Sequence, residues 1–199
     1  MSSGRVDGPI RRPRMTPERE YELLSVALEV LREVGYEGLS MELVAARGRC
    51  SKATLYRQWE NKPKMVATAL YATRPVRAEE IDTGSLRGDL LAAAEQLALQ
   101  AERDTSLLSG LAHAVLADEE LAAVVRTVVI QPAVAHVDDF IERAIARGEL
   151  PGRPTAAVFL PSMLLAASTS RPVFEGRVAD TEYLKRLVDD ALLPALLNS

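Results

Sequence analysis

Apolar residues recur three or four positions apart along most of this chain, and no segment alternates apolar and polar residues as a half-buried strand does. One such stripe consists of Leu24, Ala27, Leu28, Leu31 and Val34. This spacing puts apolar side chains on one face of a helix, where they pack against other helices. The sequence therefore predicts an all-α protein of about nine helices.

Capping residues delimit four helices within residues 15–74. Hydroxyl and amide side chains at N-caps accept hydrogen bonds from free backbone N–H groups, whereas glycine and proline end helices. The expected caps are Thr16, Ser40, Ser51 and Asn61, and the expected stops are Gly35, Gly48 and Pro75. Leu55 and Trp59 lie four apart on the short third helix and are its expected buried side. The second and third helices with the turn between them form a predicted helix-turn-helix.

Five further helical stripes follow a polar linker at residues 75–85. They cover residues 86–98, 107–116, 119–147, 154–170 and 181–197. The longest is expected to bend at Pro132, which lacks an N–H and crowds the preceding turn.

Composition excludes several classes of protein. The chain has 199 residues, 48% of them apolar, which is enough for a substantial core. Its single Cys50 excludes a disulfide framework, and with only His113 and His136 besides, no metal site or cofactor is predicted. The longest apolar stretches, such as Val158–Ala167, fall short of the roughly 18 residues of a membrane span, and Pro161 interrupts that one. The N-terminus lacks an apolar run that could serve as a secretory signal. We therefore expect a cytoplasmic protein.

Charge is distributed unevenly. Residues 1–75 contain 13 Lys or Arg and 9 Asp or Glu, whereas residues 76–199 contain 11 and 19. We predict a basic arm at 1–14, a DNA-binding domain at 15–74 and a second, acidic helical domain at 75–199. Only residues 1–75, with their excess of positive charge, suit a polyanion such as DNA. The arm has two interpretations, as a segment that reaches into a minor groove or as a solvated terminus without a role.

The third helix carries the most informative side chains. Its expected outer side presents Lys52, Ala53, Thr54, Tyr56, Arg57 and Gln58. Thr54, Tyr56 and the following Lys62 suit phosphate oxygens, while Lys52 and Arg57 suit guanine O6 and N7. Ala53 is small enough for close approach to a groove floor. The alternatives are that Lys52 and Arg57 are ordinary solvated charges and that Tyr56 packs at the edge of the domain.

These residues resemble the signature of the TetR family of bacterial transcriptional regulators. The resemblance rests on Leu43-Val-Ala, Ser51-Lys-Ala-Thr-Leu-Tyr-Arg-Gln-Trp59 and Asn61-Lys-Pro-Lys-Met-Val66. It implies phosphate contacts from Thr16, Ser40, Ser51, Thr54, Tyr56 and Lys62. It also implies that Lys52, Ala53 and Arg57 lie nearest the bases.

The turn departs from that family pattern. The family usually has Ala-Gly-Val before the serine, and this chain has Gly48-Arg49-Cys50. Arg49 therefore stands where a positive φ is usual, so either it bears some strain or the turn is reshaped. Arg47 and Arg49 are candidates for further backbone contacts.

The resemblance also implies a homodimer that binds an inverted-repeat operator in double-stranded DNA and is released by a small-molecule effector. The last two helices are the expected dimerising pair, because they are more apolar than surface helices of a monomer need to be. Candidates for the effector pocket are His113, Gln131, His136, Phe140, Phe159 and Met163. Apolar residues at helical spacing are more often core, so these side chains have that second interpretation.

Two other functions compete with a ligand-released repressor. The acidic second part is also suited to recruiting a protein partner to DNA without sensing a ligand. An enzyme is disfavoured, because the sequence lacks metal-ligand spacing, a glycine-rich phosphate loop and a nucleophile elbow.

Overall fold

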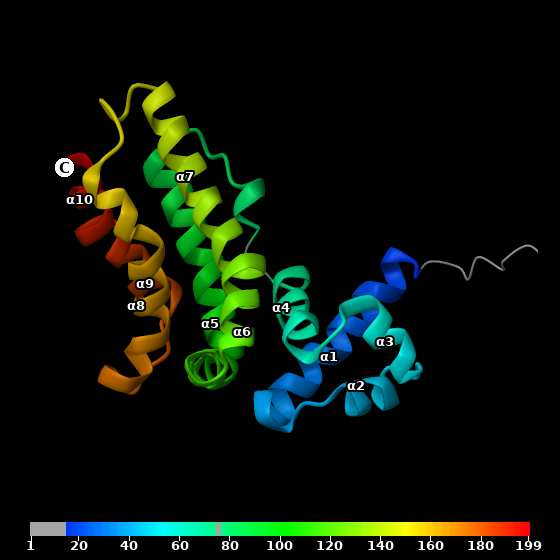
Figure 1. Ribbon diagram of the computed structural model, residues 1–199. Helices are drawn as coiled ribbons and strands as arrows, with labels where there is room; N and C mark the ends of the chain where they lie inside the picture. The colour runs from blue at the N-terminus through cyan, green and yellow to red at the C-terminus, as the bar shows by residue number, and fades with distance from the viewer. Residues whose placement is uncertain (1–14, 75–76) are drawn as a thin grey trace, which may run out of the picture.

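The computed structural model describes residues 15–74 and 77–199, so the predicted arm at 1–14 lies outside the described residues. Every regular element in this part of the chain is helical, which confirms the all-α prediction. Figure 1 shows a small unit made of α1 to α4 beside a bundle made of α5 to α10. We call α1 to α4, residues 15–74, the head.

The head follows the predicted caps closely. Its helices are α1 (Pro17–Gly38), α2 (Met41–Arg47), α3 (Lys52–Trp59) and α4 (Lys62–Ala72). The four capping side chains accept from the backbone N–H three residues ahead, at 3.0 to 3.3 Å. Gly35 has φ 71° and ψ 177°, a backbone conformation that is essentially restricted to glycine, so the regular part of α1 stops where predicted.

One predicted helix boundary in the bundle is wrong. The two helices predicted at 86–98 and 107–116 form a single helix, α5 (Leu86–Ala117), because the residues between them stay helical. A kink remains at Asp104, with φ −126° and ψ 21°. The sequence between the two stripes has no proline or glycine to end the first helix, and tertiary contacts of Asp104 accompany the kink.

Two helices of the bundle accommodate proline through π-helical turns. α6 (Glu119–Val125) continues through a π segment at Arg126–Ile130 into α7 (Gln131–Ala146), in which Pro132 lies in the first turn. The same arrangement joins α9 (Thr181–Leu187) to α10 (Leu193–Leu197) ahead of Pro194. A π turn shifts the backbone carbonyls that proline would otherwise crowd, so the expected distortion at Pro132 takes this form.

The remaining elements are short or capped by glycine. A 3-10 turn at Ala78–Glu80 precedes α5, and another at Thr155–Phe159 leads into α8 (Leu160–Glu175), which ends at Gly176 with φ 66°. The expected nine or so helices thus appear as ten α-helical segments over the described residues, because the π segments divide two long helices and the first two predicted bundle helices are one.

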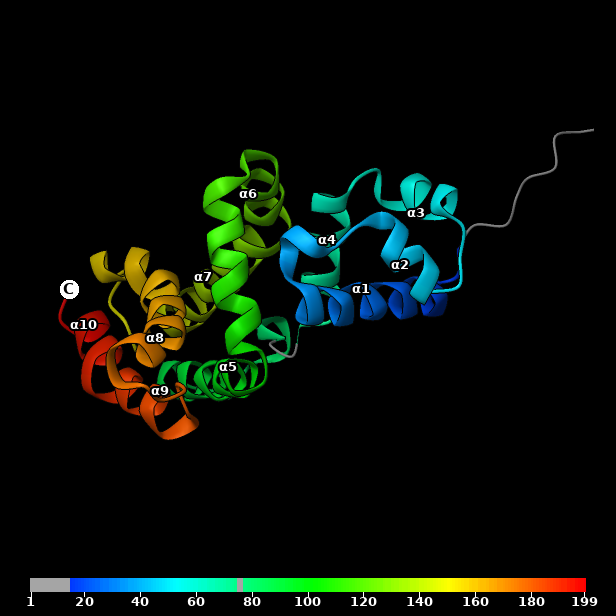
Figure 2. The same cartoon turned by 90° about the horizontal axis from the view of Figure 1, so that it is seen from below.

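The hydrophobic core has two parts that do not divide at residue 75. The first combines the apolar faces of α1 to α4 with Ala114, Leu121 and Val125 of α5 and α6. The second lies among the first half of α5 and helices α7 to α10. Figures 1 and 2 show α1 and α4 facing α5 and α6. The head is therefore packed against the bundle through a shared core, and the domain boundary at 74/75 stays a prediction.

Polar contacts cross the same junction. Both guanidinium nitrogens Nε and Nη2 of Arg32 on α1 donate to the carboxylate of Asp104, at 2.7 and 3.0 Å. Asn61 at the start of α4 donates to Glu120 on α6 at 2.6 Å. These bonds hold the start of α4 and the middle of α1 against the bundle.

Two helices pass a length and composition test for membrane spans, with mean hydropathy of 1.3 for Glu119–Ala146 and 1.2 for Thr155–Glu175. Both helices contain proline and belong to the bundle, and 17% of the first apolar window and 28% of the second is buried. Length and composition alone are weak evidence for a membrane span.

Candidate nucleic-acid interface

The turn between α2 and α3 is held tightly against α1. A Cβ atom at Gly48 would lie 2.5 Å from Cδ2 of Leu23, a fully buried side chain, so only glycine allows this approach. Arg19 on α1 donates from Nη2 to the carbonyl oxygen of Gly48. Gly48 itself has φ −76°, and Arg49 takes the left-handed conformation with φ 49°. The strained-arginine alternative of the sequence analysis is therefore the observed one.

The third helix has the two predicted sides. Leu55 is 0% exposed and Trp59 is 5% exposed, so both belong to the core of the head. Thr54 is partly exposed, and the other outward residues are exposed: Ser51, Lys52, Ala53, Tyr56, Arg57 and Gln58. Tyr56 is 45% exposed, which does not match packing at the domain edge. This side of α3 is thus available to a partner.

Hydroxyl groups line the start of α3 and of the neighbouring helices. Ser51 Oγ accepts from the Thr54 backbone N–H at 3.1 Å and lies 2.9 Å from Thr54 Oγ1. Ser40 Oγ accepts from the Leu43 N–H at 3.1 Å. A capping serine whose oxygen accepts a hydrogen bond from a backbone N–H can still donate its own hydroxyl proton. Ser40 and the Ser51–Thr54 pair therefore retain a donor for a phosphate oxygen.

A concave surface brings together predicted contacts from distant parts of the head. It has a volume of about 340 Å³ and lies between the start of α1 and α3. Its lining includes Thr16, Arg19, Thr54, Arg57 and the half-buried Cys50. Burial raises the pKa of the Cys50 thiol, which keeps that side chain neutral. Three of the residues that the sequence assigned to DNA, namely Thr16, Thr54 and Arg57, thus line one surface.

The cations of this face differ in their surroundings. Lys52 Nζ lies 3.0 Å from Glu42 on α2, and Arg47 lies 2.5 Å from Glu33 on α1. Arg57 has no ion-pair partner within residues 15–74 and 77–199 and is exposed. Arg57 is therefore a guanidinium that presents its full charge outward.

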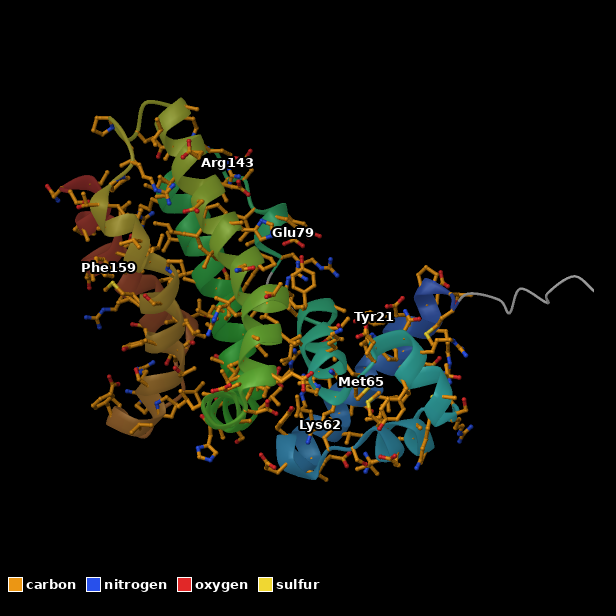
Figure 3. The ribbon with its side chains drawn as sticks, in the orientation of Figure 1. Tyr21, Lys62, Met65, Glu79, Arg143 and Phe159 are labelled. Atoms are coloured by element: carbon orange, nitrogen blue, oxygen red, sulfur yellow. The ribbon has the colours of Figure 1, made fainter. Side chains whose placement is uncertain are left out.

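Lys62, the first residue of α4 and labelled in Figure 3, is positioned by an aromatic ring. Its ammonium lies 4.1 Å from the ring centroid of Tyr36, whose hydroxyl donates to Asp118 at 2.9 Å. Burial and this carboxylate raise the pKa of Tyr36 above its ordinary range, so the phenol stays protonated. A cation–π contact orients the ammonium without removing its charge.

Arg19 and Tyr36 were not among the predicted site residues. Arg19 stabilises the turn from 29 residues away, and no local pattern in the sequence indicates that pairing. Tyr36 directly follows the glycine that ends the regular part of α1, and an aromatic residue at that place was the available signal.

The six predicted effector residues do not converge. His113 and Gln131 are exposed, and Phe140 is buried in the core of the bundle. His136 is partly buried, with its ring nitrogens 3.6 Å from Glu79 and 3.5 Å from Asp139. Phe159, the last residue of the 3-10 turn before α8, and Met163 on α8 are exposed, and they line a pocket of about 120 Å³ with Leu160, Leu192 and Leu196. That volume is below the roughly 300 Å³ of a small drug-sized site.

Two family profiles match this chain. The profile described as "Bacterial regulatory proteins, tetR family" matches residues 23–69, which include the helix-turn-helix and its flanks. The profile described as "Tetracyclin repressor-like, C-terminal domain" matches residues 80–191. The chain belongs to the TetR family.

Curated relatives and solved structures agree with this membership. A Mycobacteroides abscessus protein named "DNA-binding transcriptional repressor TetR" is 36% identical over 88% of this chain and 92% of the relative. The uncharacterized HTH-type transcriptional regulator YdeS of Bacillus subtilis is 33% identical over 85% of both chains. The crystal structure of the TetR family transcription regulator SCO0332 is 26% identical over 89% of this chain and 98% of that one, with a TM-score of 0.68.

A Rhodococcus TetR-family structure has a TM-score of 0.74 at 19% identity, covering 91% of this chain and all of its own, which supports the fold alone. This TetR-family protein is thus a transcriptional regulator whose head is a DNA-binding domain. The family resemblance read from the signature residues is confirmed.

Proposed function

We propose that this TetR-family regulator is a cytoplasmic repressor that binds an inverted-repeat operator as a homodimer. The observation that carries the proposal is the shared face of Thr16, Thr54 and Arg57 beside the exposed side of α3. Hydroxyls and cations there suit phosphates, and Lys52, Ala53 and Arg57 are nearest the position of base edges. The repressor named among the relatives supports the direction of regulation.

The proposed dimer depends on exposed apolar side chains at the start of α8 and in the 3-10 turn before it. Phe159 is 60% exposed and Met163 is 43% exposed. Figure 3 shows Phe159 on the side of the bundle away from the head. With Ala166 they are spaced four and three apart, so they form one stripe. Half-exposed stripes of this kind are typical of surfaces that a second copy covers.

The geometry of the operator tests the dimer. Two heads joined through α8 read half-sites whose separation is fixed by the protein, about one DNA turn. Inserting half a helical turn between half-sites of a selected operator should abolish tight binding in a gel-shift assay. Binding that survives the insertion would contradict a dimer with fixed heads.

Two substitutions separate phosphate contacts from base contacts. Lys62→Ala should weaken every duplex to a similar degree and reduce the slope of log affinity against log salt by about 0.9. Arg57→Ala should weaken the operator by about 1–3 kcal/mol more than a scrambled duplex. Titrations of both duplexes at several salt concentrations measure these effects, and a salt-independent affinity would remove DNA from the proposal.

We further propose that a small-molecule effector releases the protein from DNA. An effector acts only through a difference in affinity between two forms, and a coupling of about 1–3 kcal/mol lowers operator affinity roughly 5- to 150-fold. The 120 Å³ pocket on α8 is small, so the effector-bound form requires the bundle helices to separate. Screening metabolites for release of the protein from its operator tests the effector proposal. If no metabolite lowers operator affinity, the proposal is contradicted.

The small pocket also favours the second candidate, a DNA-binding module that recruits a protein partner without sensing a ligand. A densely packed bundle serves as a docking platform without opening. The two candidates differ in one measurement, because only the sensor loses operator affinity when a small molecule is added.

A further inference from the structure

An acidic side chain stands in the middle of the proposed DNA-facing surface. Glu42 lies in the first turn of α2, two residues after Ser40, and its Oε1 is 3.0 Å from Nζ of Lys52 at the start of α3. Both side chains are about half exposed, at 48% for Glu42 and 60% for Lys52. A carboxylate at this place faces the same polyanion that Ser40 and Lys52 are proposed to contact.

The ion pair between Glu42 and Lys52 adds little to the stability of the head. Exposed pairs contribute little to folding, although an acid in the first turn suits the helix dipole of α2. The hydrogen bond from Lys52 holds the pKa of Glu42 below its ordinary value, so the carboxylate is charged at neutral pH. Glu42 therefore carries its negative charge under the conditions in which the protein meets DNA.

The two predicted base-facing cations thus behave differently. Arg57 has no ion-pair partner in the described part of the chain, so it attracts any phosphate. Lys52 has its own counterion and gains little from a phosphate that replaces Glu42. In a non-specific complex, the freed carboxylate would also lie close to DNA phosphates. Non-specific binding depends on such charge terms, whereas a guanine edge adds short hydrogen bonds.

We propose that Glu42 is a specificity-determining residue, which withholds Lys52 from phosphates and releases it to duplexes that offer guanine O6 or N7. Its carboxylate lowers the affinity for arbitrary DNA more than the affinity for the operator. This proposal rests on the proposed function, because it requires that α3 faces bases.

The experiment compares Glu42→Gln with the unaltered protein on two duplexes. One is the duplex that the protein selects from a random pool, and the other has the same composition in scrambled order. The matched control is Glu95→Gln, which removes the same charge from an exposed pair on α5, 3.1 Å from Lys185 and outside the head. Binding is titrated at several salt concentrations.

We expect Glu42→Gln to raise affinity for the scrambled duplex about fivefold, which is the effect of one unit charge a few ångströms away in water. The salt slope for that duplex should steepen by about 0.9, since Lys52 then neutralises one more phosphate. The selected duplex should gain less, so the ratio of the two affinities falls. In a Lys52→Gln background, the substitution should leave the salt slope unchanged.

Three outcomes would overturn the proposal. Equal gains on both duplexes, or gains that match those of Glu95→Gln, would mean that Glu42 acts only through net charge. A loss confined to the selected duplex would mean that Glu42 itself accepts a hydrogen bond from a base. An unaltered protein that binds both duplexes equally would refute the proposed function, which separates that failure from failure of the role of Glu42.

Discussion

The head and the bundle expose different kinds of side chain. On the head, the outer side of α3 presents hydroxyls and cations, while Leu55 and Trp59 are buried. On the bundle, large apolar side chains such as Phe159, at 60% exposure, and Phe174, at 85%, are accessible. The contrast indicates that the exposed side of α3 suits a polar partner, whereas the bundle has apolar surface left to cover.

The largest expected effect concerns the core of the head. Trp59→Ala should lower the free energy of unfolding by about 3–5 kcal/mol, because it removes a buried aromatic side chain and leaves a cavity. Urea unfolding followed by circular dichroism measures this change. Tyr21→Ala, at an aromatic residue that is 53% exposed on α1, is the control and should change stability by less than about 1 kcal/mol. Equal effects would contradict the assignment of Trp59 to the core.

The next effect concerns the apolar surface of the bundle. Phe159→Glu should weaken the dimer by about 2–4 kcal/mol, because it places a charge in the centre of the proposed interface. Sedimentation equilibrium measures the dissociation constant. Leu116→Glu, at a residue on α5 that is 88% exposed, should leave dimerisation unchanged. A dimer that tolerates glutamate at 159 would place the interface elsewhere.

The junction between the two regions provides a pH-dependent test. Burial raises the pKa of Asp104, but hydrogen bonds from Arg32 and Arg103 outweigh burial and bring the pKa below its ordinary value. The charged Asp104 carboxylate therefore stabilises the fold fully above the pKa of about 3.9 that it has in the unfolded chain. This stabilisation is lost as the pH falls through the lower pKa of the folded protein. Asp104→Asn should cost about 1–3 kcal/mol at neutral pH, because it leaves Arg32 without its counter-charge.

Thermal unfolding from neutral to acidic pH checks this prediction. The difference between the variant and the unaltered protein should shrink as the pH falls below about 4. A difference that stays constant with pH would mean that Asp104 acts through packing at the kink and not through its charge.

The smallest expected effect lies in the turn. Arg49→Gly should raise stability by up to about 1 kcal/mol, since relief of the left-handed strain exceeds the added flexibility of the unfolded chain. Arg47→Gly, at a helical position of α2, should instead lower stability by about 1 kcal/mol. The denaturant concentrations at the unfolding midpoints of the two variants show whether each substitution raises or lowers stability. A destabilised Arg49→Gly variant would show that the Arg49 side chain stabilises the turn.

Local signals predicted the parts of the site that depend on neighbouring residues. The caps at Ser40 and Ser51, the stop at Gly35 and the inward side of α3 follow from spacing and from side-chain hydrogen bonding within one turn. For Arg49 the sequence left two alternatives, a strained arginine or a reshaped turn, and the structure shows the left-handed conformation. The effector residues were predicted less well, because helical spacing alone does not say which apolar positions line a cavity.

The sequence by itself determined the helices, their boundaries in the head and the family, because periodicity and capping act over a few residues. Only the tertiary structure decided which apolar residues at the start of α8 are core and which are exposed: Leu160 and Leu164 belong to the core of the bundle, and Phe159 and Met163 do not. It also paired Arg19 with Gly48, Arg32 with Asp104 and Glu42 with Lys52. These contacts join different helices, and their partners depend on how the helices pack, which no local pattern records.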